Sequence, residues 1–519
     1  MSPMQEIELK FQIPQAALAA VQAELARLNR GQNTDLLLRA AYFDTPDRKL
    51  AAARMALRVR QEGEEWVQTL KAGGSNTMMR LEDNQPAQPP RKGQAIQADL
   101  GRHLGQPAQA ALQQVLGWSP ERDPSGPQVG LIELYGTDMV RTRARVTVAA
   151  GTPYEGVVEL ALDLGRIHAG ALSVPVRELE IEAISGHPMA VILAGRDWAA
   201  RHGLWLDTQT KAHRGDRLAR EAAQPDPAPH SHATNARPAK IKPDADMDQA
   251  WRTGLESCLE HISGNLSELG TAPSRTVEAA YELRLGLRRL RAFERLWRGT
   301  AWALPSTIAD KAGVLSTQLG YWRDQQALAW LPGKLARMGW LDLPLPSPTP
   351  HAHQPADVVA LARGHLATDL CLDLLAMLLQ AEPQSASQTA SNWISQRLQR
   401  WAQRVARRGH GLSKQSDGDL HQLRKQAKRL RLTAALYAPL WPEKAGRLQE
   451  RALKAMLDAL GHIQDEVVAH HWYATQADVA PVSDPMSRAA CDWLEGRRKG
   501  LRKKAQRAFE RWLKVSSPW

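Results

Sequence analysis

Residues 6–11 of this 519-residue chain have the sequence Glu-Ile-Glu-Leu-Lys-Phe, in which charged and apolar side chains alternate. Alternation with a period of two is typical of a β-strand, because successive side chains of a strand point to opposite faces. One face of this strand therefore carries Glu6, Glu8 and Lys10, and the other face is apolar. If the apolar face packs against the protein, the three charged groups point into a polar space.

Further segments of the first 190 residues alternate in the same way, and we predict that they form one antiparallel sheet. They are residues 57–60, 66–71, 141–148, 157–163 and 178–184. Two helices are expected beside this sheet, at residues 14–28 and 188–202.

The charges on these predicted strands are segregated by sign. The basic faces carry Arg58 and Arg60, then Lys71, then Arg141, Arg143 and Arg145; the acidic face carries Glu178, Glu180 and Glu182. A sheet with one solvated face is the alternative, but such a sheet usually mixes the signs, because like charges opposite each other are destabilising. Segregation therefore favours an enclosed space whose basic wall binds phosphates and whose acidic wall binds Mg²⁺ or Mn²⁺.

The chain changes character near residue 221. Residues 221–245 are rich in proline, which is typical of an extended linker rather than a packed element. Up to Arg220 there are 26 Lys and Arg against 25 Asp and Glu, whereas the remainder has 41 against 30. The basic second half is expected to attract polyanions.

Apolar residues after the linker have helical spacing, and the second half also repeats itself. Residues 282–291 resemble residues 422–431, and residues 319–324 resemble residues 460–465, in the same order. We therefore predict two related helical halves. The whole chain is predicted to be an α+β multidomain protein, with a sheet domain over 1–220, a linker over 221–245 and an all-α bundle over 246–519.

Each repeat carries a basic stripe along one helix face. The stripes are Arg284, Arg288 and Arg291 in the first repeat and Arg424, Lys428 and Arg431 in the second. A solvated basic face is the alternative, but like charges one helical turn apart are destabilising unless an anion compensates them. The recurrence of the stripe favours an anion-binding surface.

The rest of the composition excludes some classes of protein. No apolar run is long enough to cross a membrane, and the first residues do not resemble a secretory signal. Cys258, Cys371 and Cys491 match no disulfide or metal spacing. We expect a cytoplasmic protein with reduced thiols and no membrane partner, and polyphosphate granules are one candidate place of association.

The charged residues of the first half occur in an order that resembles the CYTH, or triphosphate tunnel metalloenzyme, superfamily. Glu6-x-Glu8-x-Lys10 resembles its ExExK motif. The resemblance continues through residues 42–46, 57–60, 68–71, 163, 180–182 and 211–215. It implies an eight-stranded antiparallel β-tunnel with flanking helices, which binds triphosphate-containing substrates together with a divalent metal.

The resemblance also implies a role for each matching residue. The metal would be held by Glu6, Glu8, Asp163, Glu180 and Glu182. Phosphate oxygens would be bound by Lys10, Arg58, Arg60, Lys71, Lys211 and either Arg141 or Arg143, with Arg214 as an additional contact. The catalytic residues would be Glu6, Glu8 and Lys10, with one of the glutamates orienting the water that attacks phosphorus.

The second half resembles the CHAD domain, a histidine-containing helical domain that often follows a CYTH domain. The resemblance rests on the two repeats, above all on His421-x-Leu423-Arg424-Lys425-x-x-Lys428. It implies that inorganic polyphosphate is bound by the two stripes together with Lys425 and His421. The first repeat departs from the pattern, because Tyr281 occupies the position that matches His421.

The expected function is the metal-dependent hydrolysis of inorganic triphosphate to pyrophosphate and phosphate. One alternative is an activity on an organic triphosphate, as in a thiamine triphosphatase, a nucleoside triphosphatase or an adenylate cyclase. Another is a polyphosphate-binding scaffold without activity. Nucleic-acid binding is not favoured, because no recognisable reader motif accompanies the basic helices.

Overall fold

The computed structural model describes residues 7–29, 35–72, 81–90, 94–223, 233–271, 276–328, 355–380, 389–479 and 485–519. The chain forms two compact units. The first unit comprises residues 1–232, 266–275 and 362–380, and the second comprises 233–265, 276–361 and 381–519. Two short segments from the second half of the sequence therefore belong to the N-terminal unit.

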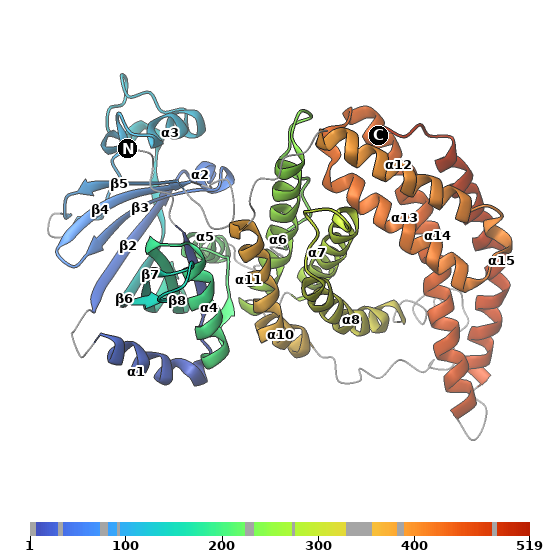
Figure 1. Ribbon diagram of the computed structural model, residues 1–519. Coiled ribbons are helices and arrows are strands. Elements are labelled where there is room, and N and C mark those ends of the chain that lie inside the picture. The colour runs from blue at the N-terminus through green and yellow to red at the C-terminus, as the bar shows by residue number, and fades with distance from the viewer. Residues whose placement is uncertain are drawn as a thin grey trace. The chain divides into compact units, whose positions relative to one another are not determined.

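The first unit is built on one sheet in which every neighbouring pair is antiparallel (Figure 1). The strand order is β5-β4-β3-β2-β6-β7-β8-β1-β9. The strands are β1 (Glu8–Gln12), β2 (Leu36–Asp44), β3 (Met55–Glu62), β4 (Glu65–Ala72), β5 (Leu81–Ala87), β6 (Ile132–Val148), β7 (Gly156–Ala169), β8 (Leu172–Gly186) and β9 (Trp205–Leu206). The antiparallel sheet predicted from the alternating segments is confirmed. The described sheet has nine strands rather than eight, because the two-residue β9 extends its edge.

The outer face of this sheet is apolar and covered by helices. Leu9 and Phe11 alternate with Lys10 on β1 and are buried, and Phe11 contacts Gly195 of α4 (Met189–His202). Strands β3 and β4 bury a second apolar cluster against α3 (Ala108–Leu116). Helices α1 (Leu18–Leu28) and α2 (Lys49–Ala52) complete this layer, so the two helices expected near residues 14–28 and 188–202 are confirmed.

The inner face of the sheet is divided along its strands. One end is apolar, where Leu218 and Ala219 of α5 (Lys211–Ala222) pack against Tyr135, Ile167 and other buried residues of the sheet. This packing is close, since a Cβ atom added to Gly215 would lie 2.1 Å from Cδ2 of Tyr135. The other end of the same face carries charged side chains. Lys211, the first residue of α5, lies between the apolar end and the charged end.

The described part of the proline-rich segment is packed, which corrects the expectation of an unpacked linker over 221–245. Residues 233–245 have an irregular backbone before α6, but they belong to the second unit. Ala239 is 1% exposed, and its amide donates to the carbonyl of Leu436 at 2.7 Å. Apolar residues such as Ile241 and Ala245 lie among the prolines and are buried, and their burial offsets the entropy lost on ordering.

The second unit is helical, as predicted. Its helices are α6 (Met247–Thr271, up to residue 265), α7 (Thr276–Trp297), α8 (Ser306–Leu328), α10 (Pro355–Arg363, up to residue 361), α12 (Ala390–Arg408), α13 (Asp417–Leu436), α14 (Glu443–Val479) and α15 (Pro485–Leu513). Its core contains the fully buried Trp251, Phe293, Trp297 and Tyr437. Helix α11 (His365–Gln380) belongs to the first unit and packs on α4.

The repeats fall on equivalent helix pairs of the second unit. The first repeat lies on α7 and α8, which pack together, and the second lies on α13 and α14, which also pack together. Helices α14 and α15 form a further antiparallel pair (Figure 1). No helix in the described ranges is both long and apolar enough to cross a membrane.

Candidate active site and basic helical surface

The strand register gathers the charged side chains on the inner face. Directly paired residues of antiparallel strands lie on the same side of a sheet. Three rows cross β1, β8, β7 and β6 in that order: Glu8, Glu182, Glu159 and Arg145; Lys10, Glu180, Ala161 and Arg143; Gln12, Glu178, Asp163 and Arg141. The acidic and basic faces predicted from single strands are therefore neighbours in one surface.

The sheet curls, so that its two flanks face each other across this surface. Lys71 on β4 is separated from Glu182 on β8 by four intervening strands, yet its charge lowers the pKa of Glu182. Arg58 and Arg60 on β3 likewise lie close enough to Arg141 on β6 for their charges to interact. A flat sheet would keep Lys71 and Glu182 about 24 Å apart, because five spacings of about 4.8 Å separate β4 from β8. The basic and acidic strands thus line a common interior.

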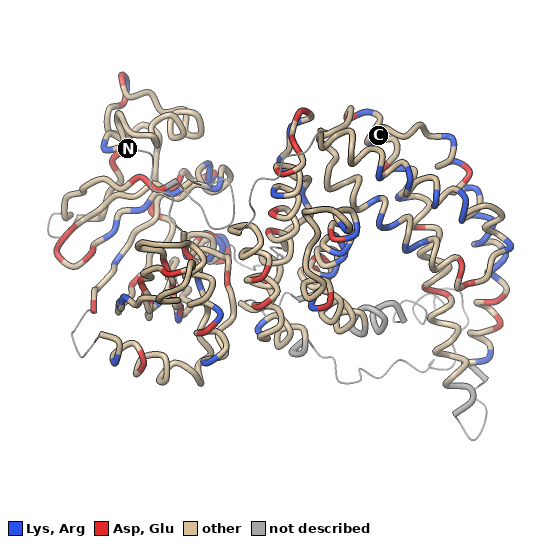
Figure 2. Tube along the Cα trace, in the orientation of Figure 1, with Lys and Arg blue, Asp and Glu red and all other residues tan. Residues whose placement is uncertain are grey.

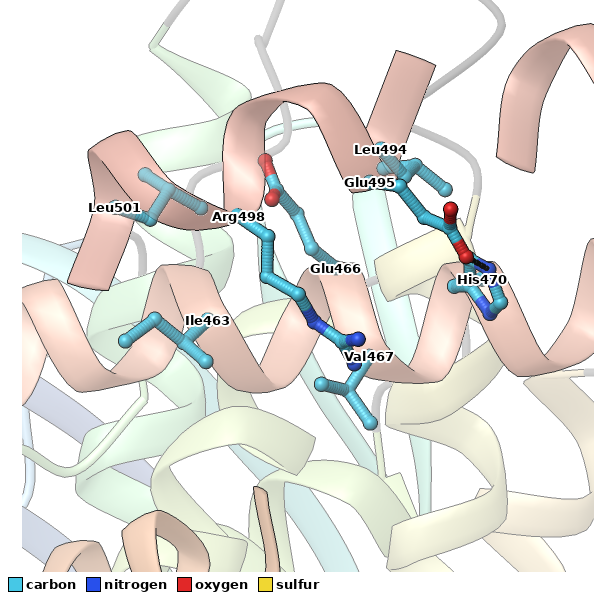
Figure 3. A pocket seen from close by; sticks show the side chains of 8 residues that line it. All are labelled: Ile463, Glu466, Val467, His470, Leu494, Glu495, Arg498 and Leu501. Carbon is cyan, nitrogen blue, oxygen red and sulfur yellow. Dashed lines mark hydrogen bonds and ion pairs between the residues drawn. The ribbon is translucent and has the colours of Figure 1, made fainter. Parts of the chain in front are cut away.

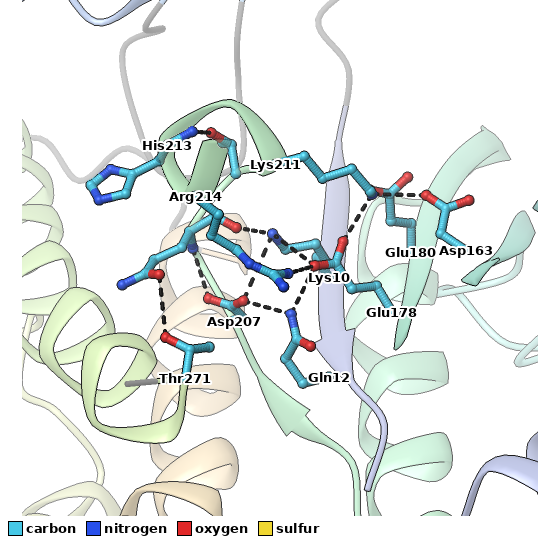
Figure 4. A network of polar contacts seen from close by, with 12 residues as sticks. Lys10, Gln12, Asp163, Glu178, Glu180, Asp207, Lys211, His213, Arg214 and Thr271 are labelled. Atoms are coloured by element: carbon cyan, nitrogen blue, oxygen red, sulfur yellow. Dashed lines mark hydrogen bonds and ion pairs between the residues drawn. The ribbon is translucent and has the colours of Figure 1, made fainter. Parts of the chain in front are cut away.

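Lys211 lies at the centre of a buried ion network (Figure 4). Its Nζ atom is 2.8 Å from Asp163, 2.8 Å from Glu178 and 2.6 Å from Glu180. Arg141 donates to both oxygens of Asp163, at 2.6 and 2.7 Å, and also to Glu180. Asp163 and Glu180 are two of the five predicted metal ligands. Each of them is therefore paired with both Lys211 and Arg141.

The network strongly perturbs the carboxylates that it contains. Burial raises the pKa of Glu178, but the charges of Lys10, Lys211 and Arg214 outweigh burial and lower that pKa to about 2. The pKa of Glu180 also lies well below its usual range, because Lys211 and Arg141 outweigh its burial. Both groups are therefore ionised at neutral pH despite being buried.

The row that contains Glu8, Glu182 and Glu159 has a different electrostatic environment. The pKa of Glu182 is raised by burial and by the negative charges of Glu8 and Glu159, its partners in the same row. Glu6, the first glutamate of the motif, lies outside the described residues. No group of three His, Cys, Asp or Glu residues within the described ranges is compact enough to hold a metal ion. Glu159 has Arg143 and Arg145 as partners at 3.7 and 3.0 Å, yet the carboxylates of this row still raise the pKa of Glu182.

The predicted phosphate ligands occupy different environments. Lys71 is 2.7 Å from Glu82, and burial together with the neighbouring Arg58 lowers the pKa of Arg60 to about 10. Arg143 lies 3.7 Å from Glu159 and is more exposed than Arg141, which is committed to the network. Arg214 is 7% exposed and donates to Glu178 and to the carbonyl of Pro175.

Some residues of the interior escaped sequence reasoning. Glu159 shares a strand face with Asp163, four residues away, and this spacing could have revealed it. Gln12 also follows Lys10 at the correct spacing, and its amide donates to Glu178 at 2.8 Å and to Asp207 at 2.7 Å. Asp207 has no comparable signal, because it lies in a loop after a two-residue strand.

The basic stripes of the second unit lie on α7 and α13 (Figure 2). Arg291 and Lys425 are exposed, whereas the other stripe residues are half-buried: Arg284, Arg288, Arg424, Lys428 and Arg431. Arg431 forms an ion pair with Glu450 at 2.6 Å, and Nδ1 of His421 lies 2.6 Å from Oε1 of Gln464.

The second unit also has a small pocket between α14 and α15 (Figure 3). It is lined by apolar side chains together with Glu466, His470, Glu495 and Arg498. Nε2 of His470 lies 3.0 Å from Glu495, and Arg498 pairs with Asp417 of α13. These contacts join α14 to α15 and α15 to α13.

The N-terminal unit is an antiparallel sheet curled around buried ion pairs, and the second unit is a set of helices with basic faces. Comparison with known protein families identifies both units. The CYTH domain family matches residues 4–215, and the CHAD domain family matches residues 253–474. The chain therefore belongs to the proteins in which a CYTH domain is followed by a CHAD domain.

Individual relatives resemble one part or the other. The inorganic triphosphatase of Haemophilus influenzae is 31% identical over 216 residues, which are 41% of this chain and 54% of that protein. The chain thus spans about half the length of this curated relative. The CHAD domain from the plant Ricinus communis is 25% identical, with a TM-score of 0.45, over 56% of this chain and 99% of that one. The HpAC1 protein from Hippeastrum, described as an adenylyl cyclase with a dominant triphosphatase activity, is 20% identical, with a TM-score of 0.30, over 42% of this chain and 98% of that one.

Proposed function

We propose that this protein hydrolyses inorganic triphosphate to pyrophosphate and phosphate, and that its helical domain binds inorganic polyphosphate. The observation that carries the proposal is the convergence of basic groups from five elements on one interior. These groups are Lys10, Arg58, Lys71, Arg141 and Lys211. A linear triphosphate is a compact polyanion that such an interior would neutralise along its length.

The basic residues would bind and orient the phosphate chain. Arginine suits this role because its planar guanidinium group presents two donors that match two phosphate oxygens. Arg58, Arg60 and Arg143 each form an ion pair with a carboxylate, which a phosphate oxygen could replace. Lys211 and Arg141 would hold the acidic network in place beneath the substrate.

The acidic row fits a hard divalent cation. Its donors are carboxylate oxygens from three neighbouring strands, the ligand type that Mg²⁺ and Mn²⁺ favour. Because Glu8 and Glu159 raise the pKa of Glu182, an added cation would relieve their mutual repulsion. Glu8 and Glu182 are the proposed ligands, together with Glu6, which precedes Glu8 by two residues in the motif. A bound cation would offset charge that develops on the phosphate oxygens.

The reaction would then need only a positioned water. Its oxygen would bond to a terminal phosphorus, the bond to the bridging oxygen would break, and pyrophosphate would leave. A carboxylate of this row would orient that water and accept its proton. No covalent intermediate on the protein is required.

The test is a substrate panel with the full chain and either Mg²⁺ or Mn²⁺. We expect phosphate release from tripolyphosphate to exceed that from thiamine triphosphate and ATP. Glu8→Gln should abolish turnover, whereas Glu24→Gln, on the outer surface beside Arg201 and His202, should leave it unchanged. Cyclic AMP formed from ATP, or a preference for thiamine triphosphate, would overturn the choice of substrate. A folded, metal-loaded protein that releases no phosphate from any of them would favour a scaffold.

Polyphosphate binding by the second unit rests on α7 and α13. Their basic stripes occupy equivalent positions on two packed helix pairs, and few carboxylates accompany them. A filter-binding competition between polyphosphate and DNA across salt concentrations would test the ligand. Stronger retention of polyphosphate at every salt concentration is expected, and equal retention of DNA would refute it. Association with polyphosphate granules in the cytoplasm would follow from such binding.

A further inference from the structure

The loop of residues 207–210, between β9 and α5, holds the lysine of the N-terminal motif. The backbone carbonyl of Gln209 accepts a hydrogen bond from Nζ of Lys10. Asp207 lies 3.8 Å from the same Nζ atom, and its amide donates to the carbonyl of Lys10 at 2.9 Å. The loop ends at Thr210, which caps α5 and is followed directly by Lys211. Two basic residues of the proposed site therefore depend on the position of this loop.

The loop is in turn held by the last residues of α6, which belong to the same unit. The amide of Thr208 donates to Oγ of Ser267 at 2.9 Å. The side-chain amide of Gln209 donates to Oε2 of Glu268 at 2.8 Å, and its oxygen accepts from Thr271 at 3.3 Å. Both the backbone and the side chains of the loop are thus fixed from α6.

Glu268 has a further partner on the other side of Lys211. Its side chain is fully buried, and Oε2 also accepts from Arg217 of α5 at 3.0 Å. One carboxylate oxygen therefore binds a residue before Lys211 and a residue after it. A buried carboxylate with two hydrogen-bonded partners, one of them charged, is costly to remove, because its partners are left unpaired. This arrangement restrains the start of α5 from both ends.

We propose that Glu268 is a positioning residue for Lys10 and Lys211, although it lies in the part of the chain that matches the CHAD family. The inference rests on the proposed triphosphatase function, since its importance comes from the phosphate-binding role of these lysines. It also means that residues 1–220 alone lack a side chain on which the site depends. The activity of the N-terminal domain is thereby tied to a residue outside the span that matches the CYTH family.

The experiment compares variants of the full chain by kcat and KM for tripolyphosphate, corrected for the folded fraction. Glu268→Gln removes the charge, and Gln209→Ala removes the side-chain contact while keeping the carbonyl that binds Lys10. Each should lower kcat/KM about 10-fold, mostly through a higher KM, because misplacing a binding group weakens transition-state and substrate contacts together. The loss in the double variant should be smaller than the product of the two single losses, because the two side chains share one hydrogen bond.

The matched control is Asp373→Asn. Asp373 also ties a segment of the second half to the N-terminal unit, through an ion pair with Arg196 at 2.8 Å, but neither residue is in the loop. Its kcat/KM should stay within about 2-fold of the wild-type value, as expected for a change remote from the chemistry. A loss as large as that of Glu268→Gln would mean that both contacts are merely structural, and would overturn the proposal.

The remaining outcomes separate this inference from the proposed function. Unchanged kcat/KM in Glu268→Gln, or fully additive effects in the double variant, would overturn the positioning role while leaving the triphosphatase intact. If the wild-type protein releases no phosphate, the proposed function is wrong, and calorimetric affinity for tripolyphosphate then provides the comparison. An affinity that is the same in Glu268→Gln and wild type, or absent in both, would overturn the inference as well.

Discussion

Replacing Lys211 by methionine should destabilise the N-terminal unit, because its ammonium group is shared by three buried carboxylates. Lys10, Lys211 and Arg214 together lower the pKa of Glu178 to about 2 from its ordinary 4.5, which corresponds to about 3 kcal/mol shared among the three cations at neutral pH. Removing one partner from a buried ion pair typically costs about 3–5 kcal/mol. We therefore expect Lys211→Met to lower the free energy of unfolding of this unit by about 3 kcal/mol.

The loss should depend on pH in a defined direction. A carboxyl group whose pKa is lowered by folding stabilises the protein above its unfolded pKa, and this stabilisation disappears as the pH falls through the folded pKa. The difference between wild type and Lys211→Met should therefore be complete above about pH 5 and shrink towards pH 2.

Hydrogen exchange of the slowest amides in β7 and β8 would measure the free energy of unfolding of the N-terminal unit. The measurement uses the full chain and does not assume that both units unfold together. Arg201→Met is the control, because Arg201 forms ion pairs on the surface of the same unit with Glu24 and Asp197. Surface pairs contribute about 0–1 kcal/mol. The reasoning is refuted if the two substitutions cost the same, or if the cost of Lys211→Met does not change between pH 7 and pH 3.

Three further predictions concern other parts of the molecule. Glu182→Gln should raise the urea midpoint of the metal-free protein at neutral pH, because a carboxyl group whose pKa is raised by folding destabilises the protein above that pKa. The same variant should lose about 100-fold in turnover of tripolyphosphate in a phosphate-release assay. Gly215→Ala should destabilise the N-terminal unit by about 1–3 kcal/mol in urea unfolding, because the new methyl group meets the ring of Tyr135, and an unchanged midpoint would contradict the packing of α5. Arg291→Glu should weaken polyphosphate binding about 10-fold in low salt and reduce the salt dependence of binding, with the charge reversal Lys49→Glu on the first unit as the filter-binding control.

Local sequence was sufficient for much of this protein. The alternation of residues 6–11 predicted β1 and the face on which Lys10 lies, and the same rule identified β3, β4, β6, β7 and β8. Helical spacing and the repeated motifs predicted the second unit. These features follow from periodicities of two and 3.6 residues, which depend only on neighbours along the chain.

Tertiary structure decided which charges meet. The contact of Lys211 with Asp163, Glu178 and Glu180 requires the register of β7 and β8 and the placement of α5, none of which a single segment encodes. The interaction of Lys71 with Glu182 requires the sheet to curl. The burial of Glu268 beside Gln209 joins residues 59 positions apart. Sequence periodicity determines the direction of each side chain, but the partner of a buried charge is set by packing between distant segments, where the loss of hydration makes an unpaired charge intolerable.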